Sequence, residues 1–245
     1  MTNSDIMEIN VLIKSLPKKD FMEIVEESFK QALKSTINHK IVSFKYFLKD
    51  ITKVSFLTTK FVFRLLTGKI SFSDVILNSK KFVYKKYNNF KKLSLKKKKE
   101  KIANLTIYFI TALLVGGGID FEGGIPDLDL KTGIKNHRNI ITHTIIGLFL
   151  LEFMARFLFK LVQKTTWNKE NMVLRTIYEI SLKEEEFING AWLGLSFHLL
   201  KDAGLFQKTI KPYSGIRGHT MGFHKSLFLG NSILAAIFSR KNEKI

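Results

Sequence analysis

Histidine and aspartate residues gather in short stretches of the second half of the chain. The first stretch reads Gly-Gly-Ile-Pro-Asp-Leu-Asp and carries Asp127 and Asp129. Two carboxylates held next to Pro and Gly in a loop suit a divalent cation that prefers oxygen ligands. Taken alone the pattern is weak, because Asp after Pro is also common in ordinary turns.

The second stretch begins eight residues after Asp129 and reads His-Arg-Asn-Ile-Ile-Thr-His. Its histidines are His137 and His143, and Arg138 suits a bidentate contact with a phosphate or a carboxylate. A lone histidine here would more often be a core residue with an ordinary hydrogen bond. Two histidines around an arginine, close to a double-Asp loop, favour a site. Thr142 is expected to cap the apolar helix that follows.

The third stretch carries His198 and Asp202 within an otherwise apolar run. Their i, i+4 spacing puts both side chains on one face of a helix. Both side chains can bind one metal ion, or the aspartate can orient the histidine, or the pair can be a local hydrogen bond that only stabilises the helix. Gly190 and Gly194 in the same run would let another helix approach closely.

A fourth stretch, rich in Gly and Ser, carries Arg217, His219 and His224. The two histidines are candidates for a second metal ion or for substrate contact, and Arg217 for binding a phosphate. A structural role for all three is equally compatible with this pattern.

These residues together predict a divalent metal site, with zinc as the first choice and manganese, iron or magnesium as alternatives. A metal-bound water would then attack the substrate, while Arg138 and Arg217 neutralise charge that develops on a phosphate. The chain contains no Cys, which excludes thiolate zinc sites, disulfides and cysteine nucleophiles. The common phosphate-loop, dinucleotide-binding and serine-hydrolase motifs are also missing from the sequence.

The order PDxD, HRxxxTH, HxxxD resembles the bacterial membrane-bound metal-dependent hydrolases of the YdjM type, over about residues 110–205. The resemblance implies a hydrolase without naming what is cut. Carried over by position, it implies six metal-site residues: Asp127, Asp129, His137, His143, His198 and Asp202.

Positive charge is concentrated in the first half of the chain. The sequence has 40 Lys and Arg against 21 Asp and Glu, a formal net charge of +19. Within residues 51–100 there are 14 basic and 2 acidic side chains. In Lys80–Lys101, hereafter the lysine-rich segment, Lys alternates with Phe and Tyr. This pattern favours anionic membrane lipid as a partner, with nucleic acid as the alternative.

The composition predicts an all-α helical bundle: 45% of residues are hydrophobic, 22 are Phe and only three are Pro. A basic amphipathic helical region is expected over residues 1–100 and an apolar helical domain over residues 101–245. Several short apolar runs, the longest being Ile102–Ile119, are either core helices or membrane-embedded helices. Residues 1–30 lack an apolar core of signal-peptide length, so the N-terminal region is expected in the cytoplasm, at the cytoplasmic membrane.

Three functions remain open at this point. The leading hypothesis is a metal-dependent hydrolase of a phosphoester at a membrane surface. The second is a metal-dependent nuclease whose lysine-rich segment binds DNA or RNA. The third is a non-enzymatic membrane-binding protein in which the His and Asp residues are structural.

Overall fold

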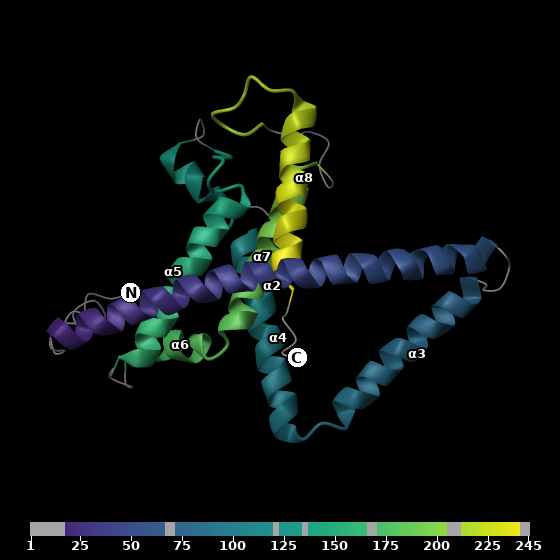
Figure 1. Cartoon of the computed structure of the whole chain (residues 1–245), viewed down its shortest axis with the longest axis horizontal. Helices are drawn as coiled ribbons and strands as arrows, with labels where there is room; N and C mark the ends of the chain where they lie inside the picture. Colours follow the sequence, from purple (N-terminus) through teal and green to yellow (C-terminus); the bar gives the residue numbers. More distant parts are fainter. Residues whose placement is uncertain are drawn as a thin grey trace. The chain divides into compact units, whose positions relative to one another are not determined.

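The computed structural model describes residues 18–66, 72–119, 123–133, 137–165, 171–204 and 212–240. Every regular element in these ranges is a helix, and they contain no strand, which confirms the all-α prediction (Figure 1). In chain order the elements are α2 (Lys18–Leu66), α3 (Phe72–Lys91), α4 (Leu95–Gly116), the short 3-10 helix η1 (Pro126–Thr132), α5 (Ile145–Lys164), α6 (Met172–Ser181), α7 (Glu184–Asp202) and α8 (Met221–Phe238).

Local sequence explains where the helices that flank the site begin and end. Helix α4 stops at Gly116 because Gly117 and Gly118 take positive φ angles of 94° and 85°, which only glycine adopts without strain. Helix α5 is capped by Thr144, whose hydroxyl accepts a hydrogen bond from the Ile146 amide. The cap predicted from sequence was Thr142, but its hydroxyl is bound elsewhere, as described below.

The chain divides into two compact units, each described here by itself. One unit joins the described residues up to Ser43 to those from Thr106 onward, and the other is Phe44–Leu105. These boundaries differ from the single division at residue 100 suggested by composition, because α2 and α4 each run through both units.

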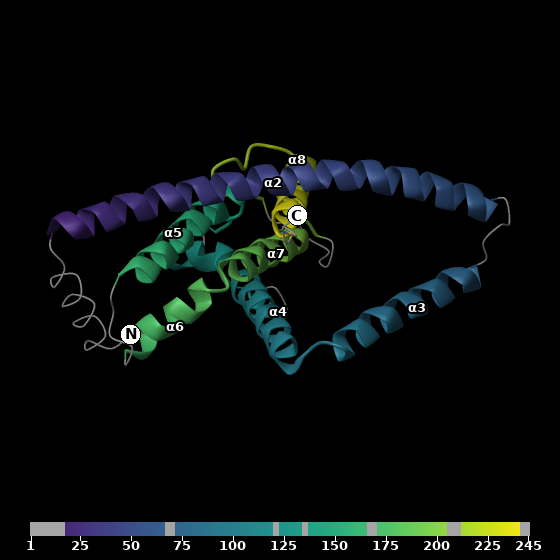
Figure 2. The same ribbon diagram turned by 60° about the horizontal axis from the view of Figure 1, so that its bottom comes forward.

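Helix α7 is the central element of the first unit and packs against α5, α6 and α8 (Figure 1 and Figure 2). Helix α4 lies so close to it that a Cβ added at Gly190 or Gly194 would fall 2.2 or 2.3 Å from a backbone oxygen of α4. The close approach expected from these glycines is therefore confirmed. The largest fully buried apolar side chains of this unit are Trp192, Tyr213, Phe228, Ile188, Leu195 and Leu199.

The second unit carries the whole lysine-rich segment. The segment runs from α3 through a break at residues 92–94 into the start of α4. Most of its lysines are exposed, and so are the rings of Phe82, Tyr84 and Tyr87. Among the helices in the described ranges, none combines the length and the apolar character needed to cross a membrane.

Candidate metal centre

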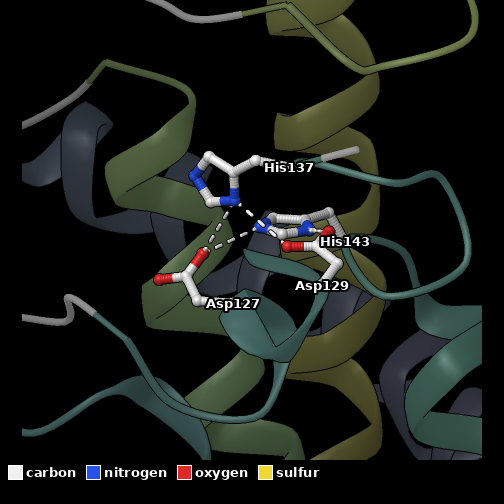
Figure 3. A group of neighbouring side chains, drawn as sticks. All are labelled: Asp127, Asp129, His137 and His143. Atoms are coloured by element: carbon white, nitrogen blue, oxygen red, sulfur yellow. Dashed lines mark hydrogen bonds and ion pairs between the residues drawn. The ribbon is translucent and has the colours of Figure 1, made fainter. Parts of the chain in front are cut away.

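Three separate parts of the chain meet at the candidate site. Helix η1 supplies Asp127 and Asp129, and the loop before α5 supplies His137 and His143 (Figure 3). The last turn of α7 supplies His198 and Asp202. Six of the eight metal-site candidates predicted from sequence therefore lie in two overlapping groups of ligand atoms, which share His143.

Four atoms face one another at the centre of the site. The Oδ1 atom of Asp127 lies 3.2 Å from His143 Nε2 and 3.6 Å from His198 Nε2. The Oδ2 atom of Asp202 lies 3.6 Å from His143 Nε2 and 3.5 Å from His198 Nε2. We refer to these four residues as the central cluster.

Four of the six distances within the central cluster match the edges of a tetrahedral metal site, although Asp127 belongs to a different group of mutually close ligand atoms from His198 and Asp202. Zinc binds nitrogen and carboxylate oxygen at about 2.0–2.2 Å, so ligand atoms at the corners of a tetrahedron are about 3.3–3.6 Å apart. The four distances given above fall within or next to this range. The ligand atoms of His143, His198 and Asp202 all lie within 4.8 Å of one another, so these three residues form the core of the candidate site.

Both histidines of the central cluster are held in the orientation that leaves Nε2 facing the centre. The Nδ1 atom of His198 lies 3.1 Å from the carbonyl oxygen of Gly116, which can only accept, so Nδ1 carries the proton. The Nδ1 atom of His143 lies 3.0 Å from the Thr142 hydroxyl, which itself donates to Asp129 at 2.7 Å. In His198 this leaves a lone pair on Nε2, the form that binds a metal. The Nε2 atom of His143 lies within hydrogen-bond distance of Asp127 Oδ1, at 3.2 Å.

The carboxylates of Asp127 and Asp202 are each held by hydrogen bonds to the oxygen that faces away from the centre of the cluster. Asp127 Oδ2 accepts a 2.7 Å hydrogen bond from the Gly123 amide. Asp202 Oδ1 accepts from Arg138 Nε at 3.2 Å and from its terminal Nη2 at 2.7 Å. Arg138 has a φ of 63°, a strained backbone for a non-glycine residue, and its guanidinium is buried against Asp202. Arg138 is thus seen orienting a ligand rather than facing solvent.

Two inward-facing atoms of the central cluster have no hydrogen-bond partner, namely His198 Nε2 and Asp202 Oδ2. Both side chains are nearly fully buried, and leaving buried polar atoms unsatisfied costs about 1–3 kcal/mol each. A cation bound at the centre would satisfy both atoms at once. The chemistry of the donor set and its unpaired atoms therefore fit a divalent metal ion.

The pKa shifts at the site also favour binding of a divalent metal ion. Burial would raise the pKa of Asp127, but the hydrogen bond from His143 and the neighbouring His198 outweigh it and lower that pKa. Burial lowers the pKa of His198, an effect that Asp202 and Asp127 oppose only in part. Neutral His198 beside ionised Asp127 is the pair of protonation states that a metal ion requires.

A second group of ligand atoms lies beside the central cluster. His137 Nδ1 is 3.1 Å from Asp129 Oδ1 and 3.6 Å from Asp127 Oδ1 (Figure 3). The other oxygen of Asp129 accepts from the Asn139 amide and from Thr142, and lies 3.3 Å from His143 Nδ1. Asp129 is therefore placed behind His143, where it orients that ring, while its first oxygen faces His137.

The remaining candidates lie outside both groups of metal-binding atoms found in the described residues. Arg217 and His219 are exposed, and the His219 ring stacks on Phe223 with centroids 4.6 Å apart. His224 is fully buried, and its Nδ1 accepts a 3.2 Å hydrogen bond from the Tyr213 amide. The structure therefore does not bring these three residues to the metal-binding groups.

Sequence reasoning missed a second buried polar cluster in the same unit, centred on Glu152. Its Oε1 accepts from His39 Nδ1 at 2.8 Å and from Arg156 Nε at 2.9 Å. Its Oε2 accepts from Trp192 Nε1 at 2.6 Å and pairs with Lys40. We call this set, with Glu184, Glu185 and Lys160 beyond Arg156, the Glu152 network.

Charges in the Glu152 network shift the acid–base properties of its members. Burial lowers the pKa of Lys40 to about 8, even though Glu152 opposes this. Burial would raise the pKa of Glu152, but the His39 hydrogen bond and the charge of Lys40 bring it down to about 2. The i, i+4 spacing of Glu152 and Arg156 in an apolar helix was a signal for part of this network. It could not reveal His39, which is 113 positions away from Glu152.

Scans of the chain against protein-family models, curated proteins and solved structures gave no significant match. The resemblance to membrane-bound hydrolases rests on the three motifs alone and stays a prediction.

Proposed function

We propose that this protein is a metal-dependent hydrolase that cleaves a phosphoester at a membrane surface. The observation that carries the proposal is the central cluster: two carboxylate oxygens, each 3.2–3.6 Å from two histidine nitrogens, with two of these four atoms lacking any hydrogen-bond partner. The resemblance of its three motifs to membrane-bound metal-dependent hydrolases supports the same class.

Charge supports a divalent ion in particular. The candidate centre contains three carboxylates, those of Asp127, Asp129 and Asp202, against the single guanidinium of Arg138. With neutral imidazoles, which metal binding requires, the group carries two negative charges in excess. Two nitrogen and two oxygen ligands favour zinc, with manganese, iron or magnesium as alternatives.

The proposed roles follow from the contacts. Asp127, His143, His198 and Asp202 hold the ion, which when bound lowers the pKa of a coordinated water and polarises a phosphoryl oxygen. Thr142 and Asp129 fix the His143 ring, and Arg138 fixes Asp202. Arg138 is therefore assigned as a positioning residue. The role of Arg217 as a phosphate contact stays a prediction.

The test is elemental analysis of the purified protein, with wild type beside His198→Ala/Asp202→Ala and beside His219→Ala as the matched control. We expect one or two equivalents of a divalent metal in wild type and in His219→Ala, and loss of the metal in the double variant. Metal-free wild type, even after supplementation with zinc or manganese, would overturn the proposal and leave the non-enzymatic hypothesis.

The lysine-rich segment is proposed to bind anionic lipid at the cytoplasmic face of the membrane. Its exposed lysines supply charge, and exposed Phe82, Tyr84 and Tyr87 are side chains that partition into a headgroup layer. Sedimentation with vesicles of phosphatidylglycerol, compared with phosphatidylcholine, tests this assignment.

A second candidate function is a nuclease, favoured by the same exposed aromatic rings, which can stack on bases while lysines contact phosphates. It predicts binding to DNA or RNA that weakens steeply with salt and is lost when the lysines at positions 91–99 are replaced by Gln. Binding to anionic vesicles without any nucleic-acid binding would decide for lipid.

A further inference from the structure

An apolar cavity of about 300 Å³ lies in the same unit as the metal centre. It is open on one side and is lined by side chains from the end of α4, from η1, from the loop before α5, and from α5 and α7. Thr142 is the only residue in its lining with a polar side chain, and that hydroxyl is already hydrogen-bonded to Asp129. We call it the α5 cavity.

The α5 cavity and the metal centre share a wall. Pro126 and Leu128 line the cavity, while Asp127 between them is a ligand of the central cluster. Likewise Thr142 lines the cavity, and the next residue, His143, is a ligand. A molecule lying across this wall would place one part in the cavity and another part at the metal centre.

The lining of the α5 cavity also reaches the surface of the protein. Leu128, Ile141, Leu150 and Leu151 line the cavity and are 40–52% exposed. Exposed leucine and isoleucine at the rim of an apolar cavity leave hydrocarbon in contact with water unless an apolar ligand covers it.

The dimensions of the cavity suit a single hydrocarbon chain. A cavity of about 150 Å³ holds one benzene ring, so about 300 Å³ accommodates on the order of a dozen carbon atoms. A second cavity of about 120 Å³ shares Val115, Ile125, Leu148 and Leu151 with the first and leads toward Glu152 and Trp192. The apolar space is thus longer than the first cavity alone.

We infer that the α5 cavity binds the hydrocarbon chain of an amphiphilic phosphoester whose phosphate group lies at the metal centre. The inference rests on the proposed function and specifies its substrate class: a phosphate ester with one long alkyl or acyl chain. The hydrocarbon chain of the substrate would supply most of the binding affinity. The metal centre would fix the position of the bond that is cleaved.

The test measures binding of dodecyl phosphate and butyl phosphate by equilibrium dialysis, below the micelle concentration of the longer compound. Wild type is expected to bind dodecyl phosphate at least tenfold more tightly than butyl phosphate. Leu151→Trp, which fills the cavity, should lower the affinity for dodecyl phosphate at least tenfold. Leu158→Trp is the matched control, because Leu158 lies on the same helix, is 42% exposed and does not line either cavity.

Two further measurements cover the cases in which Leu151→Trp fails to fold or the protein contains no metal. Leu151→Ala, which enlarges the cavity, should retain chain-length preference if Leu151→Trp fails to fold. Equal affinity for the two phosphates, or equal weakening by both Trp variants, would overturn the inference while leaving metal content as it is. A third outcome is that wild type contains no metal but binds dodecan-1-ol, and that Leu151→Trp does not bind it. This outcome would support binding of a hydrocarbon chain in the α5 cavity and would overturn the proposed function.

Discussion

The first compact unit buries two polar clusters that use similar residues in opposite ways. In the Glu152 network, three carboxylates meet the cations Lys40, Arg156 and Lys160, and both oxygens of Glu152 are hydrogen-bonded. In the metal centre, three carboxylates meet a single arginine, and two inward-facing atoms have no hydrogen-bond partner.

The comparison separates a cluster whose charges balance from one with excess negative charge, although Arg156 Nη2 in the first cluster also has no hydrogen-bond partner. The Glu152 network is balanced in charge and links α2, α5 and α7 through direct contacts. Its chemistry is therefore that of a structural core. The metal centre has the charge, the lone pairs and the spacing that a divalent ion would complete.

The largest effect is expected from Glu152→Gln. Removing this charge takes its carboxylate partner from partly buried Lys40 and one of three carboxylate partners from buried Arg156, which should lower the free energy of unfolding by about 3–5 kcal/mol. Urea unfolding followed by circular dichroism measures the change. The control is Glu26→Gln, which breaks the exposed Lys30–Glu26 pair and should leave the urea midpoint unchanged. Similar losses in both variants would refute a structural role for the network.

Acid should reveal the same network. Glu152 has a pKa of about 2 in the folded protein against 4.5 for an unperturbed glutamate, so its ionisation stabilises the fold fully above pH about 4.5. That stabilisation, on the order of 3 kcal/mol, should be lost as the pH falls toward 2. Urea midpoints of wild type and Glu152→Gln between pH 5.5 and 2.5 should therefore converge. A constant difference across this range would show that the Glu152 charge is not responsible.

At the metal centre, removing a carboxylate should have the opposite consequence. Asp127→Asn keeps an oxygen for the Gly123 amide but removes one of the excess negative charges. In chelator its melting temperature should equal or exceed that of wild type. Zinc at about one hundred times its dissociation constant should stabilise wild type by about 2.7 kcal/mol, or about 5–10 °C, and Asp127→Asn much less. Destabilisation of Asp127→Asn in chelator would mean that the site is complete without metal.

The smallest effect is expected from Thr142→Val, which removes the hydroxyl between Asp129 and His143 while keeping the shape of the side chain. Metal affinity, measured by competition with a chromophoric chelator, should fall about 10–100-fold. Thr176→Val is the control, because that hydroxyl is exposed and bonds only within α6. Unchanged affinity in Thr142→Val would remove Thr142 and Asp129 from the orienting shell.

The local part of the site could be predicted from sequence because it depends on short spacings. The i, i+4 spacing of His198 and Asp202 placed their ligand atoms 3.5 Å apart on α7, as expected for one helix face. The glycines after Gly116 and those at 190 and 194 also acted as their types predict. Thr142 was misassigned as the helix cap because its hydroxyl has a competing partner, Asp129, thirteen residues earlier.

The sequence by itself determined an all-α chain, a lysine-rich segment and three stretches of potential metal ligands, since composition, helical periodicity and short motifs are local properties. Only the tertiary structure decided which of these side chains meet. It joined six predicted ligands, left His219 and His224 apart from them, and turned Arg138 toward Asp202. It also paired His39 with Glu152, because a buried polar group takes whichever partner the packing brings within hydrogen-bond distance, however far away in the chain.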